Sequence, residues 1–245
     1  MIFTEKKFNE LDLQKQHKKC AELIREIYEE VLRGNLQHEK LKQYNTQAKW
    51  LSIPQIENFD LKTLSNTYHL HLSKANLTLK EHNLLPEIRR TDRLTEKEGF
   101  QDNCIYLDQV RSAYNVGNIL RTAEALRIGK IYFSKNTPFI NNHKVIKTSM
   151  GAYEFIPCYN EAELKDLPRP FIGLDTSDEA IPVYDFIFPK RFTLLLGNEE
   201  FGLSDSSLKE IDYLLEIPML GRKNSMNIAS AFAITAGLIR KQLSH

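Results

Sequence analysis

Short apolar runs alternate with helical stretches along the second half of the chain, and this alternation constrains the fold more than any other feature. The runs begin after Asn103: CIYLD (104–108), IYFS (131–134), FIPCY (155–159), FIGLD (171–175), FTLLL (192–196) and YLLEIPM (213–219). Helices are predicted at Asn115–Leu126, Glu161–Leu167, Ser204–Ile211 and Met226–Leu243. Strands and helices that alternate at this spacing predict an α/β fold, with a mainly parallel sheet and helices on both faces.

The first hundred residues predict helices instead. Apolar side chains recur at helical spacing from Cys20 to Val31, and Gly34 follows where a helix C-terminus favours glycine. A second helix is predicted from about residue 36 to 51, and a third starts at Asp60. The polar, highly charged stretch that follows is typical of a linker. We therefore predict a helical N-terminal extension (1–72), a linker (73–102) and an α/β domain (103–245).

Charge and cysteine usage exclude several classes of protein. The 33 Lys and Arg nearly balance the 32 Asp and Glu, so no overall positive field points to nucleic acid. Cys20, Cys104 and Cys158 are too far apart in sequence for a zinc motif, and no metal site is predicted. The sequence has neither a signal-peptide core nor an apolar run long enough to cross a membrane. We expect a soluble, cytoplasmic protein.

Three segments rich in Gly, Asn and Ser follow predicted strands. The first, LDQVRSAYNVGNILRTAEAL, contains Asn115, Gly117 and Arg121 at the start of a helix. The second is the turn GNEEFG (197–202), and the third, EIPMLGRKNSMNIASAFAI, carries Ser225 and Asn227 into the last helix. Because parallel sheets bind ligands at the carboxyl ends of their strands, these segments are candidates for one site.

Each segment also has a simpler interpretation, as a helix cap or a strand-to-helix turn. Nucleotide-phosphate sites fit less well, because the turn lacks the GxGxxG spacing and no GxxxxGK[ST] motif occurs. Glu199 and Glu200 would repel phosphate groups. A turn that carries carboxylates favours a cationic or hydroxyl-rich ligand.

Together and in this order, the segments resemble the SpoU/TrmH family of RNA ribose methyltransferases, which belongs to the SPOUT class. NVGNILRTAEAL resembles the first family motif, LLLGNEEFGLS the second and IPMLGRKNSMNIASAFAI the third, and KTSMGA (147–152) resembles the segment between the first two. The resemblance covers about residues 105–241. It implies S-adenosylmethionine as cofactor, methylation of a ribose 2′-hydroxyl in tRNA or rRNA, a homodimer, and a deep trefoil knot formed by the C-terminal segment.

The resemblance also assigns residues. Those matching the cofactor-binding positions are Leu196, Gly197, Ile217, Met219 and Met226, and those matching the catalytic positions are Arg121, Asn115, Glu199, Ser225 and Asn227. Glu199 fits the family spacing G-x-E-x-x-G, whereas Glu200 stands at a variable position. The family assigns the arginine as a base. Because a guanidinium keeps its proton to above about pH 12, we prefer Arg121 as an electrostatic clamp, with the proton taken by a phosphate or water, and keep the base role as an alternative.

Several alternatives stay open. The last helix, apolar around much of its circumference, is expected to be buried on more than one side, either in the core or in a dimer interface. Rival functions are a non-catalytic RNA-binding homologue and an enzyme of another class that uses the same sheet. The N-terminal extension is expected to position RNA or to pack as an appendage. Its candidate phosphate contacts are Lys18, Lys19, Arg89, Arg90 and Arg93.

Overall fold

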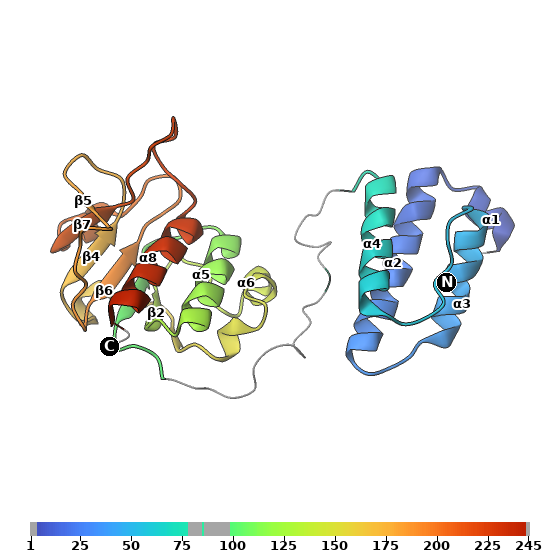
Figure 1. Ribbon diagram of the computed structural model, residues 1–245, viewed down its shortest axis with the longest axis horizontal. Helices are drawn as coiled ribbons and strands as arrows, with labels where there is room; N and C mark the ends of the chain where they lie inside the picture. Colours follow the sequence, from blue (N-terminus) through green and yellow to red (C-terminus); the bar gives the residue numbers. More distant parts are fainter. Residues whose placement is uncertain (1–3, 78–84, 86–98, 244–245) are drawn as a thin grey trace. The chain divides into compact units, whose positions relative to one another are not determined.

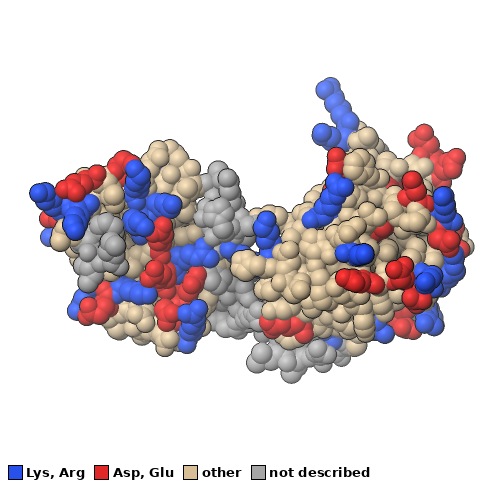
Figure 2. Space-filling view, turned by 180° about the vertical axis from the view of Figure 1, so that it is seen from behind, with Lys and Arg blue, Asp and Glu red and all other residues tan. Residues whose placement is uncertain are grey.

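The computed structural model describes residues 4–77, 85 and 99–243 and divides the chain into two compact units. The N-terminal unit is Met1–Arg90 and the C-terminal unit is Thr91–His245 (Figure 1). The first helical region extends slightly beyond the predicted limit of residue 72, and most of the predicted linker lies outside the described residues. The domain boundaries remain a prediction. On the face seen in Figure 2, basic and acidic side chains are intermixed on both units, in keeping with the balanced composition.

Four helices form the described part of the N-terminal unit: α1 (Glu5–Asn9), α2 (Leu13–Leu32), α3 (His38–Trp50) and α4 (Leu61–Lys74). The last three correspond to the predicted helices. Asp12 and Asp60 cap the starts of α2 and α4 by accepting hydrogen bonds from backbone N–H groups three residues ahead. Apolar side chains from all four helices form a separate core, which includes Phe8, Ile24, Ile27, Tyr44 and Leu64.

The basic residues proposed to contact RNA are only partly visible. Lys18 and Lys19 are exposed on α2, and the Lys19 ammonium forms an ion pair with Glu22 at 2.6 Å. Arg89, Arg90 and Arg93 lie outside the described residues. RNA contact by this unit therefore remains a prediction.

A polar cluster lies inside this helical core. Nδ1 of His17 and Nδ1 of His71 are 2.8 Å apart, and the Tyr44 hydroxyl is 3.1 Å from Nε2 of His71. His71 has no exposed surface and His17 is 5% exposed. Burial, reinforced by His17, lowers the pKa of His71 to about 4. Burial also lowers the pKa of His17, and the charge of Lys74 adds to that effect.

The buried histidine pair predicts that the N-terminal unit loses stability in acid. Unfolded histidine titrates near about pH 6.5, whereas folded His71 stays neutral down to about pH 4. Between these two pH values the unfolded chain therefore binds more protons than the folded chain. The full stability is present above about pH 6.5 and is lost progressively as the pH falls toward about 4. We expect a loss on the order of 2 kcal/mol by about pH 5, which lowers the melting temperature by several degrees.

Trp50 reports on this transition because it is the chain's single tryptophan and packs against the helical core. The midpoint of thermal unfolding, followed by Trp50 fluorescence, should be lower in acidic buffer than in neutral buffer. His71→Gln should weaken the pH dependence, while His69→Gln, at an exposed position on the same helix, should leave it intact. Equal pH dependence in both variants would contradict the assignment to His71.

The C-terminal unit contains a parallel seven-stranded sheet in the order β3-β2-β1-β6-β4-β7-β5. The strands are β1 (Cys104–Leu107), β2 (Lys130–Phe133), β3 (Cys158–Tyr159), β4 (Phe171–Leu174), β5 (Ile181–Pro182), β6 (Thr193–Leu196) and β7 (Tyr213–Glu216). Leu107 is in register with Leu196, and Leu196 with Leu174, so three strands end side by side. After β1, the chain adds β2 and β3 on one side of that strand, and the later strands β4 to β7 all lie on the other side of β1. This reversal places a ligand crevice at those strand ends.

The two faces of the sheet are covered unequally. Helices α5 (Ala113–Leu126), α6 (His143–Thr148) and α8 (Ile228–Leu243) pack on one face and complete the main core, and Figure 1 shows α5 and α8 side by side there. The other face carries a smaller core, to which Leu164 of the 3₁₀ turn η4 (Leu164–Asp166) contributes, together with Leu203 and Ile211 on either side of the short helix α7 (Asp205–Leu208). A second 3₁₀ turn, η3 (Ala152–Glu154), follows α6.

Several predicted boundaries were wrong. The helix predicted at Glu161–Leu167 is only the turn η4, and the one predicted at Ser204–Ile211 is the single turn α7, which Ser204 caps. Only the last two residues of the run 155–159 pair with β2, and Phe155 instead ends the turn η3. The short elements β5, α6 and α1 were not predicted.

The last helix is buried on one face only in the single chain. Phe232, Ala236 and Ile239 have no exposed surface, whereas Ser230, Ala233 and Gly237 face solvent. The expectation of burial on more than one side is therefore not met within one subunit. Among the described residues, no helix is long and apolar enough to cross a membrane.

Candidate functional site

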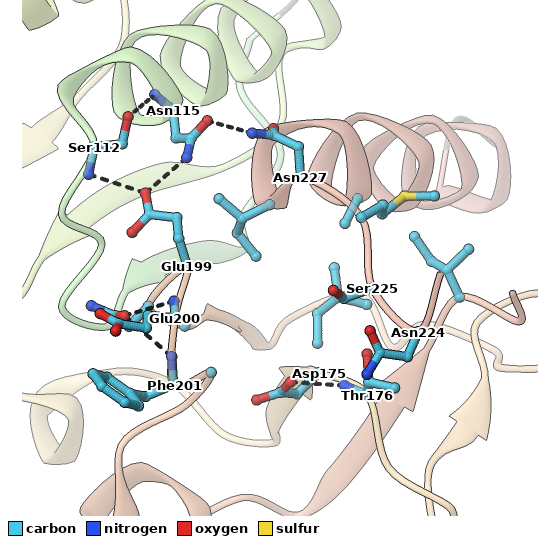
Figure 3. A pocket seen from close by; sticks show the side chains of 18 of the residues that line it. Ser112, Asn115, Asp175, Thr176, Glu199, Glu200, Phe201, Asn224, Ser225 and Asn227 are labelled. Carbon is cyan, nitrogen blue, oxygen red and sulfur yellow. Dashed lines mark hydrogen bonds between the residues drawn. The ribbon is translucent and has the colours of Figure 1, made fainter. Parts of the chain in front are cut away.

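A cavity of about 1020 Å³ lies at the carboxyl ends of β4, β6 and β7, beside the starts of α5 and α8. Figure 3 shows its side chains converging from these elements. The lining includes the following predicted site residues: Asn115, Gly197, Glu199, Ile217, Met219, Ser225, Met226 and Asn227. Eight of the ten predicted residues thus meet at one place.

The turn after β6 is closed on itself. The N–H of Asn198 donates to the Gly202 carbonyl at 2.8 Å, and the N–H of Gly202 donates back at 2.9 Å. A Cβ at Gly197 would overlap the backbone of Gly202 and Leu203, and Gly202 has a φ of +71°. Both glycines are therefore required for the turn to close against the cavity.

Carboxylates at strand ends fix this turn. Asp108, directly after β1, accepts from the N–H of Ser204 at 2.8 Å. Asp175, directly after β4, accepts from the N–H of Leu203 at 2.8 Å and from that of Thr176 at 2.8 Å. The two aspartates hold the end of the turn against both strands that flank β6.

Glu199 ties the same turn to the start of α5. Its carboxylate accepts hydrogen bonds from the backbone N–H of Arg111 at 2.9 Å, from that of Ser112 at 3.0 Å and from the Asn115 side-chain amide at 2.8 Å. Partial burial pushes the pKa of Glu199 up, but these hydrogen bonds outweigh it and the pKa is lowered. Glu199 is therefore ionised at neutral pH and acts as an anchor in the isolated chain.

Asn115 and Asn227 extend this connection to the last helix. The Asn227 amide donates to Oδ1 of Asn115 at 2.9 Å, and Oδ1 of Asn227 accepts from the N–H groups of Ala229 and Ser230. Asn227 thus caps α8, while Ser112 rather than Asn115 caps α5. The chain Glu199–Asn115–Asn227 joins all three sequence motifs (Figure 3).

The segment between the first two motifs supports α5. A Cβ at Gly117 would overlap the Thr148 hydroxyl at the end of α6. That hydroxyl donates to the Lys144 carbonyl at 2.8 Å and lies 3.2 Å from the carbonyl oxygen of Ala113. Gly117 allows the close contact between α5 and α6 that sets the position of Asn115.

Two predicted residues do not line the cavity. The side chain of Leu196 is fully buried in the core, and its carbonyl accepts from the N–H of Asp108 at 2.8 Å. Arg121 lies farther along α5 and is exposed. It forms no ion pair with any residue that the structure describes. The single chain therefore does not bring Arg121 to the other candidates.

The cavity also has lining residues that sequence reasoning missed, namely Arg111, Asp175, Thr176, Phe201, Lys223 and Asn224. A signal was available for Asp175, because FIGLD ends a predicted strand on a carboxylate. Across residues 4–77, 85 and 99–243, no three His, Cys, Asp or Glu side chains group as metal ligands would.

Comparison with known proteins shows which family the chain that forms this cavity belongs to. The SpoU rRNA Methylase family matches residues 102–237, which is more than half of the chain and includes every element around the cavity. The chain belongs to the SpoU rRNA methylase family. The predicted resemblance is thus confirmed, as is the parallel α/β fold.

Two curated relatives have the same sequence identity to this chain but differ in how much of it they cover. A 23S rRNA (uridine(2479)-2'-O)-methyltransferase of Streptomyces viridochromogenes is 29% identical in an alignment of 166 residues, which covers 62% of this chain and 57% of that protein. An uncharacterized tRNA/rRNA methyltransferase of Mycoplasma genitalium is 29% identical in an alignment of 224 residues, which covers 84% of this chain and 91% of that protein. The alignment to the Streptomyces enzyme spans little more than half of its length.

Solved structures of methyltransferases also match this chain. The SpoU methyltransferase AviRb from Streptomyces viridochromogenes, in complex with the cofactor AdoMet, matches with a TM-score of 0.53 and 26% identity. The match covers 62% of this chain and 61% of AviRb. An AdoMet-bound rRNA methyltransferase from Sinorhizobium meliloti gives a TM-score of 0.53 and 26% identity, over 58% of this chain and 57% of that one.

Proposed function

We propose that this protein is an S-adenosylmethionine-dependent methyltransferase that methylates a ribose 2′-hydroxyl in tRNA or rRNA. One observation carries the proposal: Asn115 is hydrogen-bonded both to Glu199 and to Asn227, so that one residue from each family motif meets at a single cavity at the strand ends. The names of the relatives, and AdoMet in two of the related structures, support both reaction and cofactor.

The residues of the cavity fit this cofactor. Ile217, Met219 and Met226 offer apolar and polarisable surface for an adenine ring and a methylthio group. Gly197 lets the turn that borders the cavity close against the backbone of Gly202 and Leu203. Glu199 and Asp175 are compatible with the positive sulfonium, although they would repel a phosphate. The volume of about 1020 Å³ is at the upper end for small-molecule pockets, which leaves space for the acceptor nucleotide.

The reaction forms a bond between the ribose oxygen and the methyl carbon as the bond from that carbon to sulfur breaks, and the hydroxyl proton leaves to a phosphate or water. When bound, the cofactor supplies the electrophilic methyl group. This chain must hold the ribose in line and stabilise negative charge on its oxygen. Asn115, Ser225 and Asn227 line the space where the ribose would lie, and we assign them to positioning it.

Arg121 is proposed to reach the reacting ribose in a homodimer. It is exposed and lies outside the cavity of its own chain, as does the solvent-facing side of α8 with Ser230, Ala233 and Gly237. Small side chains on that side would allow another subunit to approach closely. The same proposal includes a trefoil knot in the C-terminal segment, which is inferred from the family. It also includes a cytoplasmic location, which is inferred from the sequence.

Cofactor binding should occur without metal. We expect isothermal calorimetry to detect S-adenosylmethionine or its demethylated product binding to the purified protein, with affinity unchanged by EDTA, since no metal-ligand group occurs among the described residues. ATP and NAD serve as controls, because the carboxylates of the cavity disfavour phosphates. Tighter binding of ATP or NAD, or loss of binding in EDTA, would contradict the proposal.

RNA methylation is then tested directly. The protein is incubated with labelled S-adenosylmethionine and with tRNA or rRNA from cells that lack the gene, and the labelled riboses are mapped. Label on a 2′-oxygen supports the proposed reaction and identifies the substrate. Cofactor binding without transfer to either RNA would instead favour the non-catalytic RNA-binding homologue.

A further inference from the structure

Phe201 is a large aromatic side chain left exposed at the edge of the cavity. It is 72% exposed, on the turn between β6 and α7. Full burial of a Phe side chain would contribute about 1.5–3 kcal/mol, which this position forgoes. In Figure 3 its ring lies across the cavity from Asn224 and Ser225. It therefore borders the cavity on the side opposite the loop that precedes α8.

The backbone holds Phe201 in a fixed position. The turn is closed by the two hydrogen bonds between Asn198 and Gly202. In addition, Oδ1 of Asn198 accepts from the N–H of Glu200 at 2.9 Å and from that of Phe201 at 3.3 Å. The backbone that carries the ring is already in place before a ligand arrives, so binding has to order only the side-chain torsions of Phe201.

One face of the ring lies near a guanidinium. The Arg111 guanidinium lies over it, 5.6 Å from the ring centroid, and forms an ion pair with Glu200 at 2.9 Å. Because Phe201 is nevertheless 72% exposed, the rest of the ring surface remains open. The ion pair carries no net charge, so this spot is better suited to a flat, uncharged ring than to a phosphate.

The chemistry of the proposed reaction supplies such a ring. The 2′-oxygen is on the sugar carbon next to the one that carries the base, so the base of the methylated nucleotide must lie close to the reacting oxygen. Proteins that recognise unpaired RNA stack bases on aromatic side chains and on guanidinium planes. Resting on the proposed function, we propose that Phe201 stacks on the base of the nucleotide whose ribose is methylated, and thereby positions that ribose.

Substitutions separate stacking from simple apolar contact. Phe201→Ala and Phe201→Leu should both lower single-turnover methyl transfer to the unmethylated RNA by roughly tenfold, the effect of losing one base-stacking side chain, while Phe201→Tyr should retain most of it. Because the side chain is exposed, the melting temperature should hardly change. Cofactor affinity should stay within about twofold of the parent. The proposal is wrong if Phe201→Leu is fully active, or if cofactor affinity falls as much as transfer.

Fluorescence tests stacking without requiring catalysis. Trp50→Phe removes the only native tryptophan, and Phe201→Trp then places a reporter on the turn. The matched control carries Ile187→Trp, at a position that is 84% exposed and outside the cavity lining. Adding tRNA or rRNA from cells lacking the gene should quench only the Phe201→Trp protein. Equal quenching in both proteins, or none in either, would overturn the proposal.

The two arms also distinguish failure of this inference from failure of the proposed function. Absence of methyl transfer by the parent, together with selective quenching at position 201, would reject the enzyme and keep the stacking site. Normal transfer by the parent with no selective quenching would keep the enzyme and reject the stacking site.

Discussion

Truncation after Ser225 is expected to abolish S-adenosylmethionine binding and dimerisation together. The deletion removes Met226 and Asn227 from the cavity and the whole of α8 from the core. Phe232 and Ile239 have no exposed surface, and burying each contributes about 1.5–3 kcal/mol. With the buried alanines of the same helix, this loss is comparable with the total stability of a domain, about 5–15 kcal/mol. The C-terminal unit should therefore unfold.

The N-terminal unit should survive this truncation, because its core shares no residue with that of the C-terminal unit. Trp50 fluorescence should still show cooperative unfolding, while calorimetry shows no cofactor binding and light scattering shows no dimer. Lys241→Ala, an exposed position on α8, is the matched control and should behave like the parent. A truncated protein that remained folded, dimeric and able to bind cofactor would rule out the threaded C-terminal segment.

The sequence predicted the centre of the sheet well because the strands β1, β4 and β6 are buried on both faces. CIYLD, FIGLD and FTLLL read as continuous apolar runs, and their paired residues occupy the centre of the sheet. The edge strand β5 has only two residues, Ile181 and Pro182, so no periodicity could reveal it. The helix α6 was missed for a similar reason, since its six residues are mostly polar.

The residues of the candidate site were predicted from the motifs, but the hydrogen bonds between them could not be predicted from the sequence. Glu199 and Asn227 are 28 residues apart in the sequence, and nothing local indicates that both bond to Asn115. Leu196 was proposed to hold the cofactor through its backbone; its side chain points into the core, and its motif position alone could not show this because side-chain direction alternates along a strand. The roles of the predicted residues in binding and catalysis remain to be tested.

Arg121 gives the sharpest test of where the chemistry occurs. We expect Arg121→Ala to lower single-turnover methyl transfer by roughly a hundredfold or more, the scale of losing a group that stabilises charge in a transition state. Cofactor affinity should hardly change, because Arg121 does not line the cavity of its own chain. Arg121→Lys keeps the charge but loses the planar pair of donors, so it should recover little activity.

The controls determine whether such a loss is specific. Arg191→Ala removes another exposed arginine, just before the amino end of β6 and so at the opposite end of that strand from the cavity, and should leave transfer unchanged. Sedimentation should show the same assembly for the Arg121 variants as for the parent, because an electrostatic clamp acts on the ribose and phosphate rather than on the subunit contact. If Arg121→Ala transferred methyl groups at the parental rate, the clamp assignment would fail. The first motif would then serve only to carry Asn115, through which α5 is joined to Glu199 and α8.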